Sequence, residues 1–113
     1  MNFLFIMVDQ LRADTLGCAG HPVVRTPNLD ALASEGARFS QAFVQQAVCG
    51  PSRMCYYTGR YCHNHRSNWN ETPLPRDEQT VAHLFRSGGY RAISCGKDHY
   101  VADPRDGGKP FEP

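Results

Sequence analysis

A cysteine and an arginine whose spacing could build an anion site occur in the segment Cys49-Gly-Pro-Ser-Arg53, which is followed by Thr58-Gly-Arg60. Pro51 suits the first position of a helix, which would place Cys49 just before that helix and Arg53 about one turn along it. The free N–H groups of a helix start attract anions and lower the pKa of a nearby thiol. We therefore predict an anion-binding corner with Cys49 as its nucleophile; taken alone, a merely buried cysteine at a helix start is the more common alternative.

Three short segments have the composition of β-strands. Residues 2–8 form a continuous apolar run, which is typical of a strand buried on both faces of a parallel sheet. Residues 38–43 and 90–94 are predicted to form two further strands. Asp9 would then lie at the carboxyl end of the first strand, the edge at which open α/β sheets bind ligands.

Two helices are predicted between these strands. Thr26 and Pro27 suit an N-cap and a first helical position, and apolar residues recur at helical spacing until Gly36. Residues 78–86 carry an apolar face at the same spacing and end before two glycines. The alternation of strand and helix predicts an α/β fold, and residues 103–113 are rich in turn-formers with no closing strand.

Composition narrows the class of protein. The chain has 113 residues, of which 41% are hydrophobic and 20% charged, with a formal net charge of +1. It is too apolar for a disordered segment and too balanced in charge for an electrostatically driven nucleic-acid binder. No secretory signal is visible, and no run approaches the ~20 apolar residues that span a bilayer. With five cysteines, an odd number, we expect mostly reduced thiols in a cytoplasmic protein without nucleic-acid or membrane partners.

The motif Cys49-x-Pro-Ser-Arg53 with Thr58-Gly-Arg60 resembles the signature of the sulfatase family, in which the cysteine is oxidised to formylglycine after translation. Asp9-Gln10, residues 26–30 and residues 96–99 are similar to other parts of that family's N-terminal region, in the same order. The resemblance covers almost the whole chain. It implies the alkaline-phosphatase-like fold, a mostly parallel sheet between helices, of which residues 1–113 would be an incomplete N-terminal portion.

The resemblance implies a role for each matching residue. Cys49 would be the precursor of formylglycine, whose hydrated aldehyde attacks sulfur or phosphorus and later expels the product by regenerating the aldehyde. Arg53 would hold the hydrated aldehyde and offset its charge. Lys97 would bind a transferring oxygen, and His99 would contact the other hydroxyl or the anion.

The same resemblance implies a divalent cation held by Asp9, Gln10 and the formylglycine derived from Cys49. Hard cations prefer oxygen ligands, and these residues supply only part of a six-fold or higher shell. The remaining family ligands belong to a downstream region that is absent here. Gln10 departs from the Asp-Asp pair common in sulfatases and replaces a charged ligand with a neutral one, which leaves calcium, manganese and magnesium open. Calcium is the expected ion.

Residues 64–74 are similar to the corresponding stretch of the phosphonate monoester hydrolase and phosphodiesterase branch. In that branch the asparagine matching Asn70 faces the substrate, and Gln10 also fits it, although Asn70 could equally be a turn residue. Lys97 and His99 instead resemble the sulfatase branch. Of the two substrate classes, we favour sulfate esters over phosphonate monoesters and phosphodiesters.

A zinc module built from Cys55, Cys62, His63 and His65 is a minor alternative, because the spacing lacks a paired C-x-x-C or the usual pair of histidines. The sequence thus predicts a hydrolase of small-molecule sulfate monoesters, matured by a transient formylglycine-generating partner. A phosphonate or phosphodiester hydrolase and an inactive truncated fragment are the alternatives. We expect residues 1–113 alone to have little turnover and marginal stability, since an open sheet leaves unpaired edges.

Overall fold

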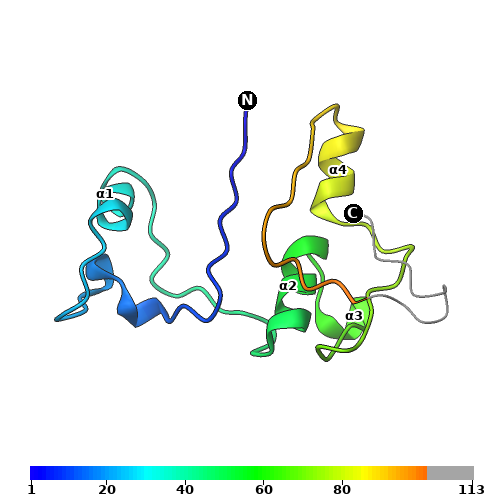
Figure 1. Cartoon of the computed structure of the whole chain (residues 1–113), viewed down its shortest axis with the longest axis horizontal. Coiled ribbons are helices and arrows are strands. Elements are labelled where there is room, and N and C mark those ends of the chain that lie inside the picture. Colours follow the sequence, from blue (N-terminus) through cyan, green and yellow to red (C-terminus); the bar gives the residue numbers. More distant parts are fainter. Residues whose placement is uncertain (102–113) are drawn as a thin grey trace. The chain divides into compact units, whose positions relative to one another are not determined.

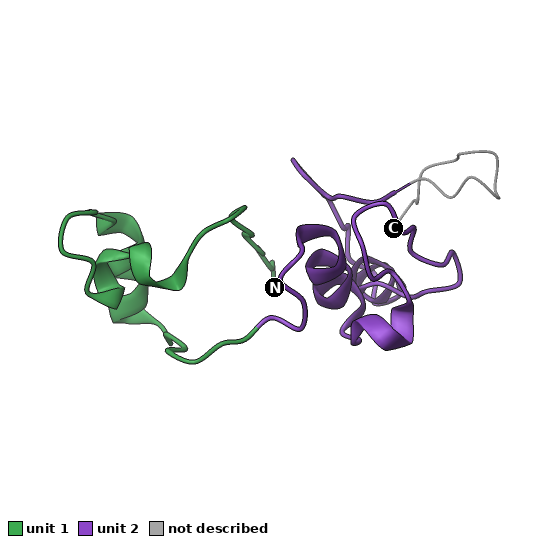
Figure 2. Cartoon of the chain, turned by 90° about the horizontal axis from the view of Figure 1, so that it is seen from below, with its two compact units in different colours: residues 1–43 green, residues 44–113 purple. Residues whose placement is uncertain are grey.

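The computed structural model describes residues 1–101, and the regular elements among them are short helices (Figure 1). The chain divides into two compact units, Met1–Phe43 and Val44–Pro113 (Figure 2). Residues 103–113, where the sequence indicates turns, lie outside the described part of the chain. None of the helices within residues 1–101 has the length and apolarity that crossing a membrane requires.

The first unit contains two 3-10 turns, η1 (Ala13–Thr15) and η2 (Gly17–Ala19), followed by helix α1 (Pro27–Glu35). The helix predicted after Thr26 is confirmed, with Pro27 in its first position and Gly36 at its end. The Asp30 carboxylate accepts hydrogen bonds from the Cys18 N–H at 2.6 Å and from the Thr26 hydroxyl at 2.8 Å. This carboxylate therefore joins η2 to the first turn of α1.

The second unit contains helices α2 (Cys49–Thr58), α3 (Cys62–His65) and α4 (Val81–Ser87), and α2 contacts both of the others. Its small apolar core includes Met54, Cys55 and Leu74. The predicted helix at residues 78–86 is observed as α4, but it begins at Val81. Thr80 and His83 form a reciprocal capping box there, which is why the helix starts later than its apolar pattern suggested.

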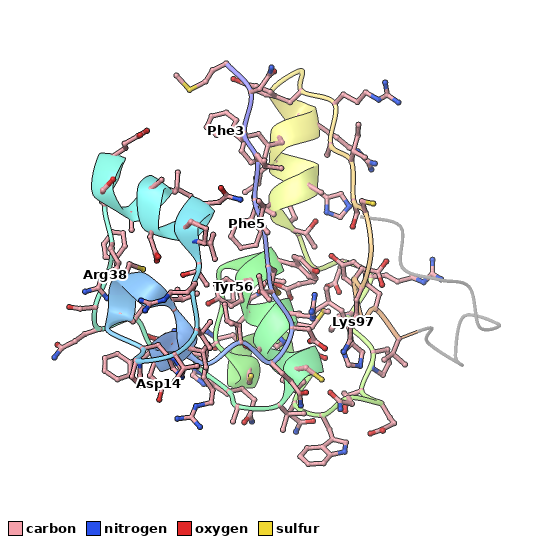
Figure 3. All side chains as sticks on the ribbon, turned by 60° about the vertical axis from the view of Figure 1, so that its left-hand side comes forward. Phe3, Phe5, Asp14, Arg38, Tyr56 and Lys97 are labelled. Carbon is pink, nitrogen blue, oxygen red and sulfur yellow. The ribbon has the colours of Figure 1, made fainter. Side chains whose placement is uncertain are left out.

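The strands predicted at residues 2–8, 38–43 and 90–94 are not observed, since the described residues 1–101 contain no β-strand. Leu4, Ile6 and Ile93 expose 85%, 73% and 75% of their surface, so these segments do not form the buried layer of a sheet. Figure 3 shows Phe3 and Phe5 on the extended N-terminal segment. A strand depends on ladder hydrogen bonds with neighbours, whereas a helix closes its hydrogen bonds locally.

Acidification should loosen the junction between η2 and α1. The hydrogen bond from Thr26 lowers the pKa of Asp30 below its ordinary value of 3.8. A lowered folded-state pKa means that the stabilisation is present above the unfolded value and is lost as the pH falls through the folded value. Hydrogen exchange of the Cys18 amide should therefore accelerate, relative to the intrinsic rate, when the pH is lowered below about 4.

The matched control is Glu35→Gln, which removes an exposed carboxylate from the other end of α1. Asp30→Asn should abolish most of the acid-dependent change in Cys18 protection, and Glu35→Gln should leave it intact. Equal acid responses in the Asp30→Asn variant and the unaltered chain would contradict the assignment of this junction to the carboxylate.

Candidate active site

Helix α2 begins at Cys49, two residues earlier than the sequence predicted. Val48 is the N-cap with extended backbone (φ −77°, ψ 135°), and Pro51 occupies the third helical position instead of the first. The first-turn N–H groups of a helix have no partner within the helix, so a proline costs no hydrogen bond anywhere in that turn. Cys49 is therefore a half-buried residue of the helix itself.

Asn70 binds the start of α2 through its side-chain oxygen. Its Oδ1 accepts the Gly50 N–H at 2.9 Å and lies 3.5 Å from the Sγ atom of Cys49. The side chain thus satisfies one of the unpaired N–H groups of the first turn and contacts the candidate nucleophile. Asn70 was predicted to face the substrate. In the structure its side chain contacts the start of α2.

Gly50 is a residue of this site that was not predicted from the sequence. A Cβ atom at position 50 would lie 2.9 Å from Asn70 Oδ1 and 3.2 Å from Asn70 Cα. The second contact is with backbone and cannot be relieved by a side-chain rotation. The glycine inside the Cys-x-Pro segment was the available signal, because glycine in a helix is unfavourable unless another backbone approaches closely.

Arg53 links α2 to the segment that carries Lys97. Its side chain is 5% exposed, and its Nη1 donates a hydrogen bond to the Lys97 carbonyl oxygen at 2.6 Å. The contact is therefore with the backbone of Lys97, which is an exposed residue. Lys97 and the α2 residue Tyr56 are both labelled in Figure 3. This hydrogen bond brings together two residues that were predicted to share one site although 44 positions separate them.

His99 has an uncommon backbone conformation and an orphaned ring nitrogen. Its φ is 64°, in the left-handed region that non-glycine residues rarely occupy. Its Nδ1 is buried and has no hydrogen-bond partner within residues 1–101. A buried polar atom without a partner is costly, so this geometry is typical of a position that receives a ligand or another polar group.

A tyrosine pair holds the segment after His99 against α2. The rings of Tyr57 and Tyr100 stack with centroids 5.2 Å apart. Burial raises the pKa of the Tyr100 hydroxyl, which therefore stays protonated at neutral pH. This pair was not predicted, because no local pattern in the sequence connects positions 57 and 100.

The Thr58-Gly-Arg60 motif ends α2 and anchors the turn that leads to α3. The Thr58 hydroxyl donates to the Met54 carbonyl oxygen at 2.7 Å, and Gly59 adopts φ 67° as the C-cap, a conformation that favours glycine. Arg60 Nη1 pairs with Glu78 Oε1 at 2.5 Å, and Glu78 is almost fully buried. This part of the motif thus stabilises the end of the helix.

The predicted residues Cys49, Arg53, Asn70, Lys97 and His99 all belong to the second unit. Cys49 contacts Asn70, and Arg53 contacts Lys97. The predicted metal ligands Asp9 and Gln10 belong to the first unit. Both are exposed, and Gln10 adopts φ 53°. A sharp turn in the backbone therefore directly follows Asp9.

The sequence compares closely with known proteins. The family model named Sulfatase matches residues 1–112. The chain belongs to the sulfatase family. The N-acetylglucosamine-6-O-sulfatase of Bacteroides thetaiotaomicron is 34% identical over 104 residues, which cover 92% of this chain and 19% of that protein. The iduronate 2-sulfatase of Homo sapiens is 39% identical over an alignment of 109 residues, and the match covers 86% of this chain and 18% of that protein. The chain thus spans about a fifth of the length of these relatives.

Solved structures also resemble this sulfatase-family chain. The phosphonate monoester hydrolase of Agrobacterium radiobacter matches with a TM-score of 0.69 and 44% identity over 73% of this chain and 16% of its own. A protein solved in complex with its substrate D-glucosamine-2-N,6-O-disulfate matches with a TM-score of 0.66 and 35% identity over 69% of this chain and 16% of its own. Both are enzymes of the alkaline phosphatase superfamily, which supports the predicted superfamily although the described residues contain no strands.

Replacing Gly50 by alanine should separate the start of α2 from Asn70. Because a Cβ atom would contact the backbone of Asn70, we expect Gly50→Ala to lower the free energy of unfolding by about 1–3 kcal/mol. The Cys49 thiol should also react faster with an alkylating reagent, since its contact with Asn70 would be lost. Urea denaturation and timed alkylation measure the two effects.

Gly88→Ala is the matched control, because a Cβ atom there would have its nearest neighbour at 3.4 Å, an ordinary van der Waals distance. We expect it to change stability by less than about 0.5 kcal/mol. Similar effects of the two substitutions on stability and on Cys49 reactivity would refute the close approach at Gly50.

Proposed function

We propose that the complete protein hydrolyses sulfate monoesters by means of a formylglycine derived from Cys49. The observation that carries this proposal is the contact of Cys49 and Gly50 with Asn70 at the start of α2, in a chain that the sulfatase family model matches over residues 1–112. A sulfate ester is an anion, and the N–H groups of a helix start favour anions. The position of Cys49 thus suits attack on such a substrate.

The neighbouring residues have roles that follow from their chemistry. Arg53 carries a permanent positive charge with five donors, so a buried Arg53 would attract the substrate anion toward α2. Lys97 would bind an outer oxygen of the transferring group, and His99 would donate to it from its ring. Asn70 would orient the nucleophile and, in the enzyme–substrate complex, contact the substrate.

The formylglycine would supply a hydrated aldehyde as nucleophile, which a thiol cannot replace in this chemistry. We propose that its formation requires a formylglycine-generating enzyme that reads the segment around Cys49. Val48 has extended backbone immediately before the helix. Such a partner would act on this segment before α2 forms.

The donor set of Asp9 and Gln10 fits a divalent cation. A carboxylate followed directly by an amide offers two hard oxygen ligands, both residues are exposed, and the positive φ of Gln10 turns the backbone beside Asp9. We propose that these two residues hold calcium, with manganese or magnesium as alternatives. When bound, such a cation would offset negative charge on the substrate and favour ionisation of the nucleophile.

Loss of Cys49 should abolish turnover of the complete protein. Cys49→Ala removes the precursor of the nucleophile, and we expect kcat for an aryl sulfate to fall by about three orders of magnitude or more. Cys95→Ser is the control, because Cys95 is an exposed cysteine of the same unit without a proposed role. Initial rates and thermal melts of both variants separate chemistry from folding.

Mass spectrometry of the Cys49 peptide from active protein should find an aldehyde that reacts with a hydrazide. Full activity in protein whose Cys49 is an unmodified thiol would overturn the formylglycine mechanism. Activity retained by a correctly folded Cys49→Ala variant would overturn the assignment of the nucleophile itself.

Hydrolysis of phosphonate monoesters or phosphodiesters is the second candidate function. It is favoured by the 44% identity and TM-score of 0.69 to the phosphonate monoester hydrolase. The contact of Asn70 with Cys49 also supports this candidate, because the resemblance to that branch implies an asparagine that faces the substrate. Sulfate and phosphoryl groups are both tetrahedral, so the site geometry alone accommodates either.

A matched substrate series separates the two functions. With one aryl leaving group, we expect kcat/KM of the complete protein to be highest for the sulfate monoester and about tenfold or more lower for the phosphonate monoester and the phosphodiester. Asn70→Ala should lower kcat/KM, whereas Asn68→Ala, at an exposed position of the same loop, should have little effect. A higher kcat/KM for the phosphonate monoester than for the sulfate monoester would contradict the first proposal and support phosphonate hydrolysis.

A further inference from the structure

Two sulfurs and one imidazole form a cluster near the C-terminal end of α2, away from Cys49. The Sγ atom of Cys55 lies 3.4 Å from Sγ of Cys62 and 3.3 Å from Nε2 of His65. Cys55 and His65 are buried, and Cys62 is partly exposed. We call these three residues the thiol cluster. None of them is needed for the chemistry proposed at Cys49.

The hydrogen bonds of His65 define where its proton lies. The Ser67 backbone N–H donates to Nδ1 of His65 at 3.2 Å. A backbone N–H can only donate, so Nδ1 carries the lone pair and the ring proton of the neutral imidazole is on Nε2. Burial lowers the pKa of His65, which keeps the ring neutral at neutral pH. The Nε2–H group therefore faces the sulfur of Cys55.

This tautomer argues against a resident metal, although all three ligand atoms lie within 4.8 Å of one another. A metal-bound histidine coordinates through an unprotonated nitrogen and donates from the other one. In the thiol cluster the nitrogen nearest the sulfurs is the protonated one, and the other accepts. The arrangement instead suits two sulfurs with a hydrogen-bond donor beside them.

We propose that Cys55 and Cys62 are a thiol pair that closes to a reversible disulfide by exchange with a low-molecular-weight disulfide such as glutathione disulfide. Closing the pair shortens the sulfur–sulfur distance from 3.4 Å to about 2.0 Å. Cys55 lies in the last turns of α2 and Cys62 is the first residue of α3, so a small adjustment of the intervening turn brings them together.

The exchange has two steps. The Cys62 thiolate, which is the more accessible, attacks one sulfur of glutathione disulfide, whose S–S bond breaks and releases one glutathione thiolate. The Cys55 thiolate then attacks Sγ of Cys62, forms the internal disulfide and releases the second glutathione thiolate. The two electrons and the two thiol protons of the pair end on two glutathione molecules, so the exchange is balanced.

His65 assists the second step. Burial and the hydrogen bond with Cys62 raise the pKa of the Cys55 thiol to about 11, so its thiolate is scarce without help. The Nε2–H of His65 donates to Sγ of Cys55 and so stabilises the thiolate that attacks Cys62. Cys55 is therefore the resolving thiol, and Cys62 is the one that meets the oxidant.

The disulfide would join the end of α2 to α3 and enclose the Thr58-Gly-Arg60 turn. Cross-linking two residues removes conformational freedom from the unfolded chain and raises stability. We therefore expect the oxidised chain to melt several degrees above the reduced chain. The cross-link would also remove the second cysteine of α2 from competing reactions and leave Cys49 as the free thiol of that helix.

The test equilibrates the full chain with defined ratios of glutathione disulfide to glutathione, traps free thiols with an alkylating reagent and maps the peptides by mass spectrometry. We expect a Cys55–Cys62 disulfide to form at least tenfold more favourably in the folded chain than in urea. Cys18 and Cys95 should remain as thiols or mixed disulfides. Dithiothreitol should reverse both the cross-link and the rise in melting temperature.

Cys62→Ser should abolish the cross-link and its stabilisation, whereas the control Cys95→Ser should preserve both. Three outcomes would overturn the proposal. These are free Cys55 and Cys62 while other cysteines are oxidised, equal pairing in native and denaturing buffer, and retention of one Zn²⁺ by the reduced chain that Cys62→Ser abolishes. The peptide map of the unaltered chain decides the matter even if a variant fails to fold.

Discussion

The hydrogen bond from the Gly50 N–H to Asn70 Oδ1 is the interaction on which the candidate site depends. It connects the first turn of α2 to a loop 20 residues further along the chain. The same amide oxygen reaches the sulfur of Cys49, so the orientation of the helix start and the surroundings of the thiol are set together. A side chain at position 50 would break this arrangement, because the backbone of Asn70 lies too close.

The sequence predicted helices α1, α2 and α4 because their signals are local, but it did not predict the short helix α3. Pro27 and Gly36 bound α1 where expected, since a proline at the start and a glycine after the end act on neighbouring backbone groups. The start of α4 was misplaced because His83 takes the capping position usually filled by glutamate or glutamine. The predicted strands are not observed in the described residues, because strand formation depends on contacts that are not local. A strand at residues 2–8 depends on partners distant in sequence, which no local pattern reveals.

The residues of the candidate site were predicted partly from local spacing and partly from resemblance to the family. Cys49 and Arg53 were predicted from their spacing along one helix, and both lie on α2, although that helix begins at Cys49 and not at Pro51. Asn70 and Lys97 were selected by resemblance, and only the structure reveals what connects them to α2. Asn70 contacts the helix through its side chain, whereas Lys97 contacts Arg53 through its backbone carbonyl. The close packing of Gly50 against Asn70 depends on tertiary structure and therefore had no sequence signal beyond the glycine itself.

Helix α2 carries two cysteines with different chemistry, and its geometry keeps them apart. Cys49 and Cys55 are six residues apart, which is about 9 Å along a helix axis. A disulfide requires Cα atoms within about 7 Å, so the two cannot pair while the helix is intact. Cys55 faces Cys62 and His65 in the core, whereas Cys49 lies at the helix start beside Asn70. The same helix that presents the candidate nucleophile thus protects it from the nearest competing thiol in the sequence.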